Sequence, residues 1–387
     1  MRIGQAIYLD HQASTPVDPR VLSAMMPYFR KSFGNPHSAD HARGWQAAKA
    51  VEHAAALVAK LIGAEADEII FTSGATEANN LALLGLCENA AQGKRRRVLM
   101  SAIEHKSVLA VGRFLHERLG YEVERVPVDT LGFVDRQGLR EMLDDNVLAV
   151  SIMAVNNEIG TIQDMDELSG LIKESGALFH CDAAQAPCAM DMGGFSSFVD
   201  LLSLSGHKMY APQGIGALFI RRDLQGRIEP LIHGGGQQQA LRSGTVPVAL
   251  CVGMGMAASL LGGKDAEEER ESLRKRRDWL VRKLMRLRWP VVLNGPEDDK
   301  RHPGNANLRF EGFDAHDILA ALQPRLAAST GSACASGIPE PSHVLRAMGL
   351  SSQEAESSIR FSLGRDSSDS DVEEAVALIE EGLSKLA

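Results

Sequence analysis

Between Glu68 and about residue 220, the sequence alternates short strand-like runs with longer stretches of helical character. The strand-like runs cover residues 68–72, 98–100, 122–126, 147–153, 177–179 and 200–204. Parallel strands need a long crossover, usually a helix, to reach their neighbour, and helices then bury both faces of the sheet. The alternation therefore predicts an α/β fold with one mostly parallel sheet covered by helices.

The rest of the chain predicts a smaller second unit. Before and after the alternation we expect a strand at 6–10 and helices at 17–29, 44–62 and 249–261, the second one ended by Gly63. Further on we expect helices at 267–287, 314–322 and 371–386 and strands at 291–293, 305–310 and 359–363. This pattern predicts a large domain over residues 15–260 and a small α+β domain made of residues 1–14 and 261–387.

Composition narrows the function class. The 387 residues suffice for two domains, and the net charge of −9 argues against direct nucleic-acid binding. No apolar run reaches membrane-spanning length and the first residues hold no signal-peptide core, so we expect a cytoplasmic enzyme. The five scattered cysteines form no CxxC pair, which argues against a disulfide framework and against a metal site. Four of them lie among apolar residues and are expected to be buried.

A lysine and an aspartate each follow a strand-like run. Lys208 comes after residues 200–204, in a loop rich in Gly, Ser and Pro, and Asp182 follows residues 177–179 with Gln185 three positions later. A lysine in an apolar pocket becomes a usable amine, and an aspartate can keep a pyridine nitrogen protonated. The alternative for Lys208 is a surface lysine in a turn. Together the residues indicate a pyridoxal-phosphate (PLP) site.

Two more segments have a plausible place in such a site. Residues 73–80 form a small-residue loop between a strand and an expected helix at 81–91, which predicts a phosphate cradle. The alternative is an ordinary turn with Thr76 as the helix cap and Glu77 as the capping acid, and the two interpretations are compatible. His105 follows another strand, at the sheet edge where loops converge. A lone histidine there is more often structural.

Two segments allow competing interpretations. Cys334 is flanked by glycine and serine, which predicts a mobile loop at about 327–340 with an exposed, reactive thiol; the alternative is a loop cysteine without a role. The basic stretch 274–288 is best explained as the solvated face of a helix, and the alternative is a docking patch for a partner or nucleic acid.

Taken together, the chain resembles the cysteine desulfurases, PLP enzymes of the fold-type-I aminotransferase superfamily, along nearly its whole length. It looks most like the group that includes the iron–sulfur-cluster and nitrogenase-type enzymes. The resemblance is carried by the segments at 8–10, 72–77, 104–105, 156–160, 182–185, 205–208, 242–245, 331–334 and 358–361. It implies a large PLP-binding domain with a mostly parallel, seven-stranded sheet, and a small domain that carries the cysteine loop.

The resemblance also implies site residues. Lys208 would bind the PLP aldehyde, Asp182 the pyridine nitrogen and Gln185 the ring hydroxyl, while His105 would stack on the ring and act as acid and base. The phosphate would be held by Ala75, Thr76, Ser205 and His207, and by Thr245 from the partner subunit of a homodimer. Asn157 would contact the cofactor and, with Arg360, the substrate carboxylate. Cys334 would take sulfur from L-cysteine as a persulfide and leave L-alanine.

The sulfur acceptor protein stays open. The resemblance allows iron–sulfur cluster assembly, tRNA thiolation or DNA phosphorothioate modification. Relatives that dock a cluster scaffold carry a C-terminal extension, whereas this sequence stops at Ala387, which puts such docking in doubt. His11 and Gln12 stand where relatives more often have small residues. Two alternatives are a selenocysteine lyase or aminotransferase, neither of which needs Cys334, and a non-catalytic sulfur-carrier scaffold, which needs neither Lys208 nor Asp182.

Overall fold

The structure, a computed structural model, describes residues 1–4, 6–331 and 341–387. Its largest sheet has seven strands in the order β3-β9-β8-β7-β6-β4-β5. In chain order these are β3 (Ile69–Thr72), β4 (Arg97–Ser101), β5 (Glu122–Val126), β6 (Val147–Ser151), β7 (Leu178–Asp182), β8 (Leu201–Ser205) and β9 (Gly216–Ile220). Strand β9 is antiparallel to both neighbours and all other pairs are parallel. The predicted mostly parallel, seven-stranded sheet is confirmed.

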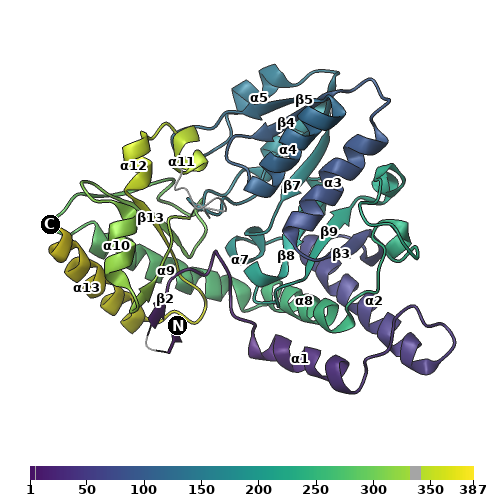
Figure 1. Cartoon of the computed structure of the whole chain (residues 1–387), viewed down its shortest axis with the longest axis horizontal. Helices are drawn as coiled ribbons and strands as arrows, with labels where there is room; N and C mark the ends of the chain where they lie inside the picture. Colours follow the sequence, from purple (N-terminus) through teal and green to yellow (C-terminus); the bar gives the residue numbers. More distant parts are fainter. Residues whose placement is uncertain (5, 332–340) are drawn as a thin grey trace.

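Helices cover both faces of this sheet (Figure 1). They are α1 (Pro19–Arg30), α2 (Ala42–Ile62), α3 (Ala75–Asn89), α4 (Lys106–Leu119), α5 (Arg136–Met142), α6 (Met165–Glu174), α7 (Ala186–Ala189) and α8 (Val248–Leu261). Side chains alternate along each strand: Ile70 packs with α3 and α4, whereas Phe71 packs with α2 and α8 on the other face. Helix α2 ends at Gly63, whose φ of +75° is left-handed, as predicted.

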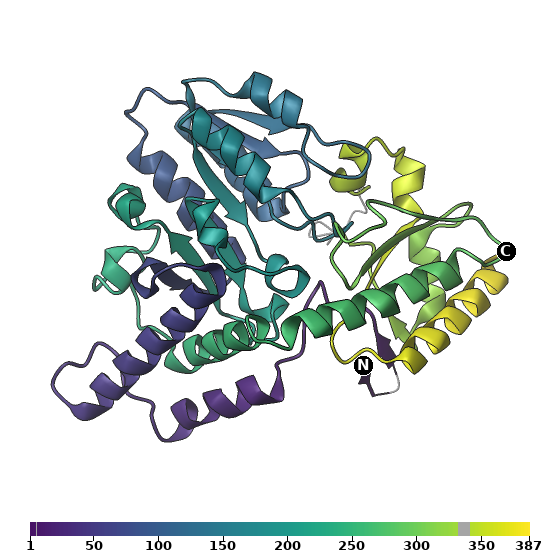
Figure 2. The ribbon, with the colours of Figure 1, turned by 180° about the vertical axis from the view of Figure 1, so that it is seen from behind.

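A second sheet, with its own core, lies beside the first (Figure 2). It is antiparallel, in the order β10 (Val291–Leu293), β11 (Asn305–Phe310) and β13 (Ser358–Ser362). Its helices are α9 (Ala266–Leu284), α10 (Ala315–Leu322), α11 (His343–Ala347), α12 (Ser352–Glu356) and α13 (Asp369–Leu386). A small third sheet joins β1 (Arg2–Ile3), β2 (Ala6–Tyr8) and β12 (Leu326–Ala327), so the first residues pack with the last third of the chain.

Helix α3 begins six residues before the position predicted from the sequence. Its cap is Gly74 rather than Thr76, so the cap residue has no side chain to accept from the first N–H groups of the helix. The Glu77 carboxylate instead accepts a hydrogen bond from the Ser73 N–H at 2.9 Å. Threonine and asparagine have modest helix propensity, which hid this first turn, but burial of Ala78 and Asn79 holds it against the sheet.

The basic stretch at 274–288 is not a uniformly solvated helix face. Arg277 is only 2% exposed, and its guanidinium donates to Asp278 at 2.5 Å and to the His302 carbonyl at 3.3 Å. The prediction is therefore wrong for Arg277. Arg274 pairs with Glu271 and Arg276 with Asp369, both through side-chain contacts inside the chain. Much of the positive charge is thus neutralised, which weakens the docking alternative.

Within the described residues, no single helix combines the length and apolar character needed to cross a membrane. One bent pair, α8 with α9 at 76°, passes the test of length and composition when the two are taken together. Most of the residues of α8 are buried, many of them in the core that covers one face of the large sheet.

The free energy of unfolding should fall in mild acid, because buried neutral histidines become protonated there. Burial lowers the pKa of His180 to about 4 and of His302 to about 3. A histidine with a lowered folded-state pKa stabilises fully above its unfolded pKa, near 6.5, and loses this contribution as pH falls toward the folded value. Within that window, each of these two histidines should lower the free energy of unfolding by about 1.4 kcal/mol per pH unit.

We therefore expect the melting temperature to drop steadily from pH 6.5 to pH 4.5 in differential scanning calorimetry. A His180→Gln variant should show a shallower drop, whereas His53→Gln, which changes an exposed histidine, should follow the parent chain. An equal slope in all three proteins would contradict this prediction.

Candidate active site

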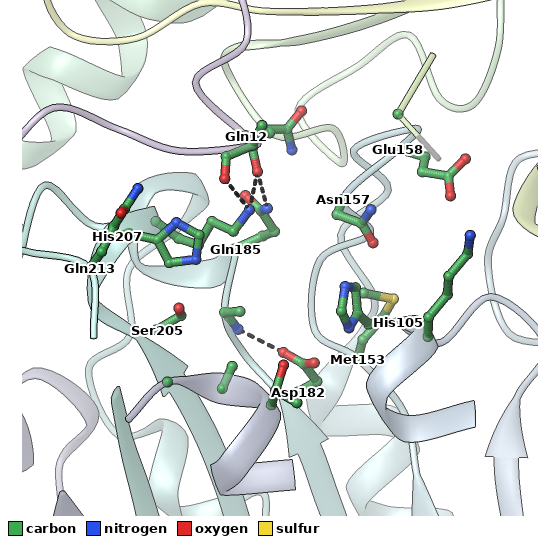
Figure 3. A pocket seen from close by; sticks show the side chains of 18 of the residues that line it. Gln12, His105, Met153, Asn157, Glu158, Asp182, Gln185, Ser205, His207 and Gln213 are labelled. Carbon is green, nitrogen blue, oxygen red and sulfur yellow. Dashed lines mark hydrogen bonds between the residues drawn. The ribbon is translucent and has the colours of Figure 1, made fainter. Parts of the chain in front are cut away.

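A cavity of about 540 Å³ lies at the carboxyl ends of the parallel strands, between the large sheet and β13 (Figure 3). Open α/β sheets place ligands at this edge, because the loops that follow the strands converge there. The predicted residues that line it are Ala75, Thr76, His105, Asn157, Asp182, Gln185, Ser205, His207, Lys208 and Arg360. Residues more than 280 positions apart in the sequence thus meet in one cavity.

For two predicted residues, the structure does not show a place in the cavity lining. Thr245 is exposed in this single chain. Cys334 and most of its loop lie outside the described residues. Gly331 and His343, on either side of that segment, do line the cavity.

The N-terminus of α3 presents backbone donors to the cavity. Ala75 and Thr76 are its first two residues, and the first N–H groups of a helix have no partner within the helix. A Cβ at Gly216 would come within 2.6 Å of the Gly74 backbone, so glycine is what lets β9 pass this close. Backbone donors and the helix dipole together favour a phosphate here, with Ser205 and His207 lining the same cavity.

Asp182 ends β7 and forms the base of the cavity. Its two carboxylate oxygens accept hydrogen bonds from Asn79 Nδ2 at 2.8 Å and from the Ala184 N–H at 3.0 Å. A carboxylate oxygen only accepts hydrogen bonds, so both donors match it. A buried carboxylate facing into a cavity is suited to bind a protonated ring nitrogen.

Lys208 follows β8 and lines the same cavity. Its Nζ donates to the carbonyl oxygens of Gln12 at 2.5 Å and Ala13 at 2.7 Å. Burial lowers the pKa of Lys208 to about 8, and the positive charge of Arg360 adds to this effect. A substantial fraction of the amine is therefore neutral near pH 7.5, as a nucleophile requires.

His105 caps α4 and faces the same cavity. The Ser107 N–H donates to its Nδ1 at 3.2 Å, so Nδ1 carries the lone pair and the neutral ring carries its proton on Nε2. Desolvation lowers the pKa of His105 below its ordinary value. At His207, burial and then the charge of Lys208 lower the pKa to about 4. Both rings are neutral at pH 7.

Arg360, from β13, brings the only guanidinium among the described residues that line the cavity. It donates to Asp10 Oδ1 at 2.6 Å, to Ser329 Oγ at 2.9 Å and to the Asn157 carbonyl at 2.7 Å. Within the described part of the chain, its buried Nε has no partner. These contacts hold the cation at the cavity wall, where an anionic substrate group can meet it.

Gln12 is a lining residue whose role could not be assigned from the sequence. Asn305 donates its Nδ2 to Gln12 Oε1 at 2.6 Å, and Asn305 Oδ1 in turn accepts from Arg301, which has no acceptor of its own. This chain of bonds fixes the orientation of the amide, so Gln12 Nε2 is a buried donor that finds no partner in residues 1–4, 6–331 and 341–387. His11 lies edge-on to Tyr8, and burial lowers its pKa to about 4.

Residues that the sequence analysis missed also line the cavity: Met153, Glu158, Gln213 and His343. Only their places in the fold bring them there, although Glu158 falls within the segment 156–160 that carried the resemblance. The described residues contain no group of three or more His, Cys, Asp and Glu side chains placed to hold a metal ion.

The donor set fits PLP. Unpaired helix N–H groups suit the phosphate, Asp182 suits the pyridine nitrogen, and Lys208 supplies an amine with a lowered pKa for the aldehyde. Fold and site thus define a PLP-dependent enzyme of fold type I.

Comparison with known proteins identifies the group. Residues 7–375 match the class-V aminotransferase family. A cysteine desulfurase IscS from Rickettsia massiliae (strain Mtu5) is 44% identical over 98% of this chain and 92% of its own length. A solved structure of a NifS-like protein superimposes with a TM-score of 0.90 at 34% identity, covering 98% of this chain and 99% of that one.

A structure of SspA in complex with cysteine gives a TM-score of 0.80 at 36% identity, covering 92% of this chain and 99% of that chain. The chain therefore belongs to the class-V aminotransferase family, and within it to the PLP-dependent cysteine desulfurases.

Proposed function

We propose that this chain converts L-cysteine to L-alanine with PLP and transfers the sulfur through a persulfide on Cys334. The observation that carries the proposal is the pairing, across one cavity, of an amine at Lys208 with a buried carboxylate at Asp182. PLP, when bound, supplies a conjugated ring that accepts the electron pair released at the substrate Cα.

The chain's own residues divide the remaining work. Arg360 and Asn157 hold the substrate carboxylate, which orients the Cα–H bond. Lys208, once free, moves the Cα proton, since its lowered pKa lets it both accept and release a proton near neutral pH. His105 carries a proton on Nε2 and can donate it within the cavity.

Sulfur transfer then needs a thiolate. Cys334 attacks the substrate sulfur, a new S–S bond forms, and the Cβ–S bond breaks with its electron pair passing to the substrate carbon, which is protonated to yield alanine. A dithiol reductant, or an acceptor protein with its own thiol, takes the terminal sulfur and frees Cys334 for another cycle. The identity of that acceptor stays open.

We also propose that the enzyme is a homodimer in which Thr245 reaches the phosphate of the partner subunit. Thr245 is exposed in the single chain. Residues 22–45 expose several large apolar side chains, including Phe33 at 74% and Trp45 at 60%. Such a patch is typical of a protein interface. Light scattering should give twice the 41.8 kDa chain mass, and Phe33→Glu should shift the protein toward monomer.

The division into a large domain (15–260) and a small one (1–14 with 261–387) is part of the same proposal. Its support is the separate core of the second sheet, which includes Ile7 and Leu9 from the chain start. We also propose that the enzyme is cytoplasmic.

The test of the activity uses purified chain with PLP, L-cysteine and a dithiol. We expect a yellow protein whose visible spectrum changes on adding cysteine, with sulfide and alanine released in equal amounts. A spectral change without either product would contradict desulfurase activity and favour another amino-acid substrate. A protein that cannot be loaded with PLP would overturn the cofactor assignment.

A further inference from the structure

Asn79 connects the two side chains that would contact the cofactor ring. It lies in α3 and is 0% exposed. Its Nδ2 donates one hydrogen to Asp182 Oδ2 at 2.8 Å and the other to Ser107 Oγ at 3.0 Å. Ser107 Oγ lies 2.8 Å from Nδ1 of His105. The Asn79 amide therefore links Asp182, at the base of the cavity, to the imidazole ring of His105 through Ser107.

The orientation of this amide is forced by Asp182. An ionised carboxylate only accepts hydrogen bonds, so the atom that faces it must be nitrogen. As a result, Asn79 Oδ1 is buried and has no partner among the residues that the structure describes. A native structure keeps an orphaned acceptor of this kind only where another interaction outweighs it.

A second buried carboxylate, Glu104, lies close enough to Asp182 to interact with it electrostatically. Glu104 is also 0% exposed. It accepts a hydrogen bond from the Met153 N–H at 2.6 Å and interacts with the Ser151 side chain, but its Oε2 has no partner among the described residues. Burial raises the pKa of Glu104, and the charge of Asp182 raises it further. Two neighbouring carboxylates in a dry site do not both ionise, and the one whose two oxygens both accept from donors keeps the charge.

We infer that Asn79 is a positioning residue that holds the negative charge on Asp182 rather than on Glu104 and orients His105 through Ser107. This inference rests on the proposed function, because it acts through the Asp182 contact to the cofactor ring nitrogen. The other charged or titratable groups around the pair include His105, His180, Cys181, Lys208 and Arg125.

The test compares PLP with an analogue in which CH replaces the ring nitrogen. Asn79→Leu should weaken PLP binding to the apo-protein about 10- to 100-fold, the worth of one charge-assisted hydrogen bond, measured by equilibrium dialysis. Binding of the analogue should change by less than about twofold, because it has no nitrogen for Asp182 to bind. Equal losses for both ligands would mean that Asn79 only supports packing, and would overturn the inference.

Two further variants sharpen the result. Adding Glu104→Gln to Asn79→Leu should recover part of the PLP affinity, because the competing carboxylate is gone; no recovery would contradict the charge-selection step. Asn80→Leu is the matched control, since Asn80 is the next residue of α3 and bonds only the Thr76 carbonyl among the described contacts. It should bind PLP as the parent chain does. Failure of the parent chain to release sulfide would instead overturn the proposed function.

Discussion

Replacing Cys334 with serine is expected to reduce sulfide release from L-cysteine by at least about 10³-fold, the scale on which loss of a catalytic nucleophile acts. Serine is nearly isosteric, but its hydroxyl stays protonated near pH 7 and cannot form a persulfide. Cofactor loading should be unchanged, and the visible spectrum should still respond to cysteine, because Lys208 and Asp182 are untouched. The measurement is methylene-blue quantification of sulfide alongside the absorbance spectrum.

Other cysteines of the chain provide the controls. Cys251 is buried, and Cys188 donates its thiol hydrogen to the Lys208 carbonyl at 3.2 Å. Burial raises the pKa of each to about 12, so neither forms a thiolate at neutral pH. Cys251→Ser should keep desulfurase activity. Amino-acid turnover that survives Cys334→Ser would favour a selenocysteine lyase or aminotransferase over a desulfurase.

Replacing Lys208 with alanine is the second large effect that we expect. The variant should lose activity by at least about 10³-fold, because both the covalent hold on PLP and the group that moves the Cα proton are removed. After borohydride reduction, mass spectrometry should find the cofactor mass on the Lys208 peptide of the parent chain and on no peptide of the variant. The Asp182 contacts should persist, since Asn79 and Ala184 do not depend on Lys208.

Lys173→Ala is a suitable control for this experiment. Lys173 lies in α6 and bonds the Ser197 carbonyl at 2.6 Å, far from the lining of the cavity. Its removal should leave cofactor attachment and turnover intact. Cofactor mass on a different lysine of the parent chain would contradict the assignment of Lys208.

Much of the fold could be predicted because its signals are local. Strand-like runs followed by helical stretches indicated the mostly parallel sheet, and Gly63 marked the end of α2. The start of α3 was misplaced because Thr76, Asn79 and Asn80, which have modest helix propensity, fall among its first six residues. The prediction of a solvated face on α9 was wrong at Arg277. Periodicity does not reveal that a carboxylate and a backbone carbonyl accept hydrogen bonds from this guanidinium, which allows it to be buried.

By itself, the sequence determined the chemistry: a lysine and an aspartate after strands, a small-residue loop before a helix, and a cysteine among glycine and serine. These features are encoded within a few positions of one another. Only the tertiary structure decided which groups share the cavity and in what state. Burial lowers the pKa of Lys208 to about 8, and Arg301, through Asn305, fixes the amide of Gln12. Asn79 donates to an aspartate 103 positions away, because desolvation and hydrogen bonding depend on neighbours that only folding brings together.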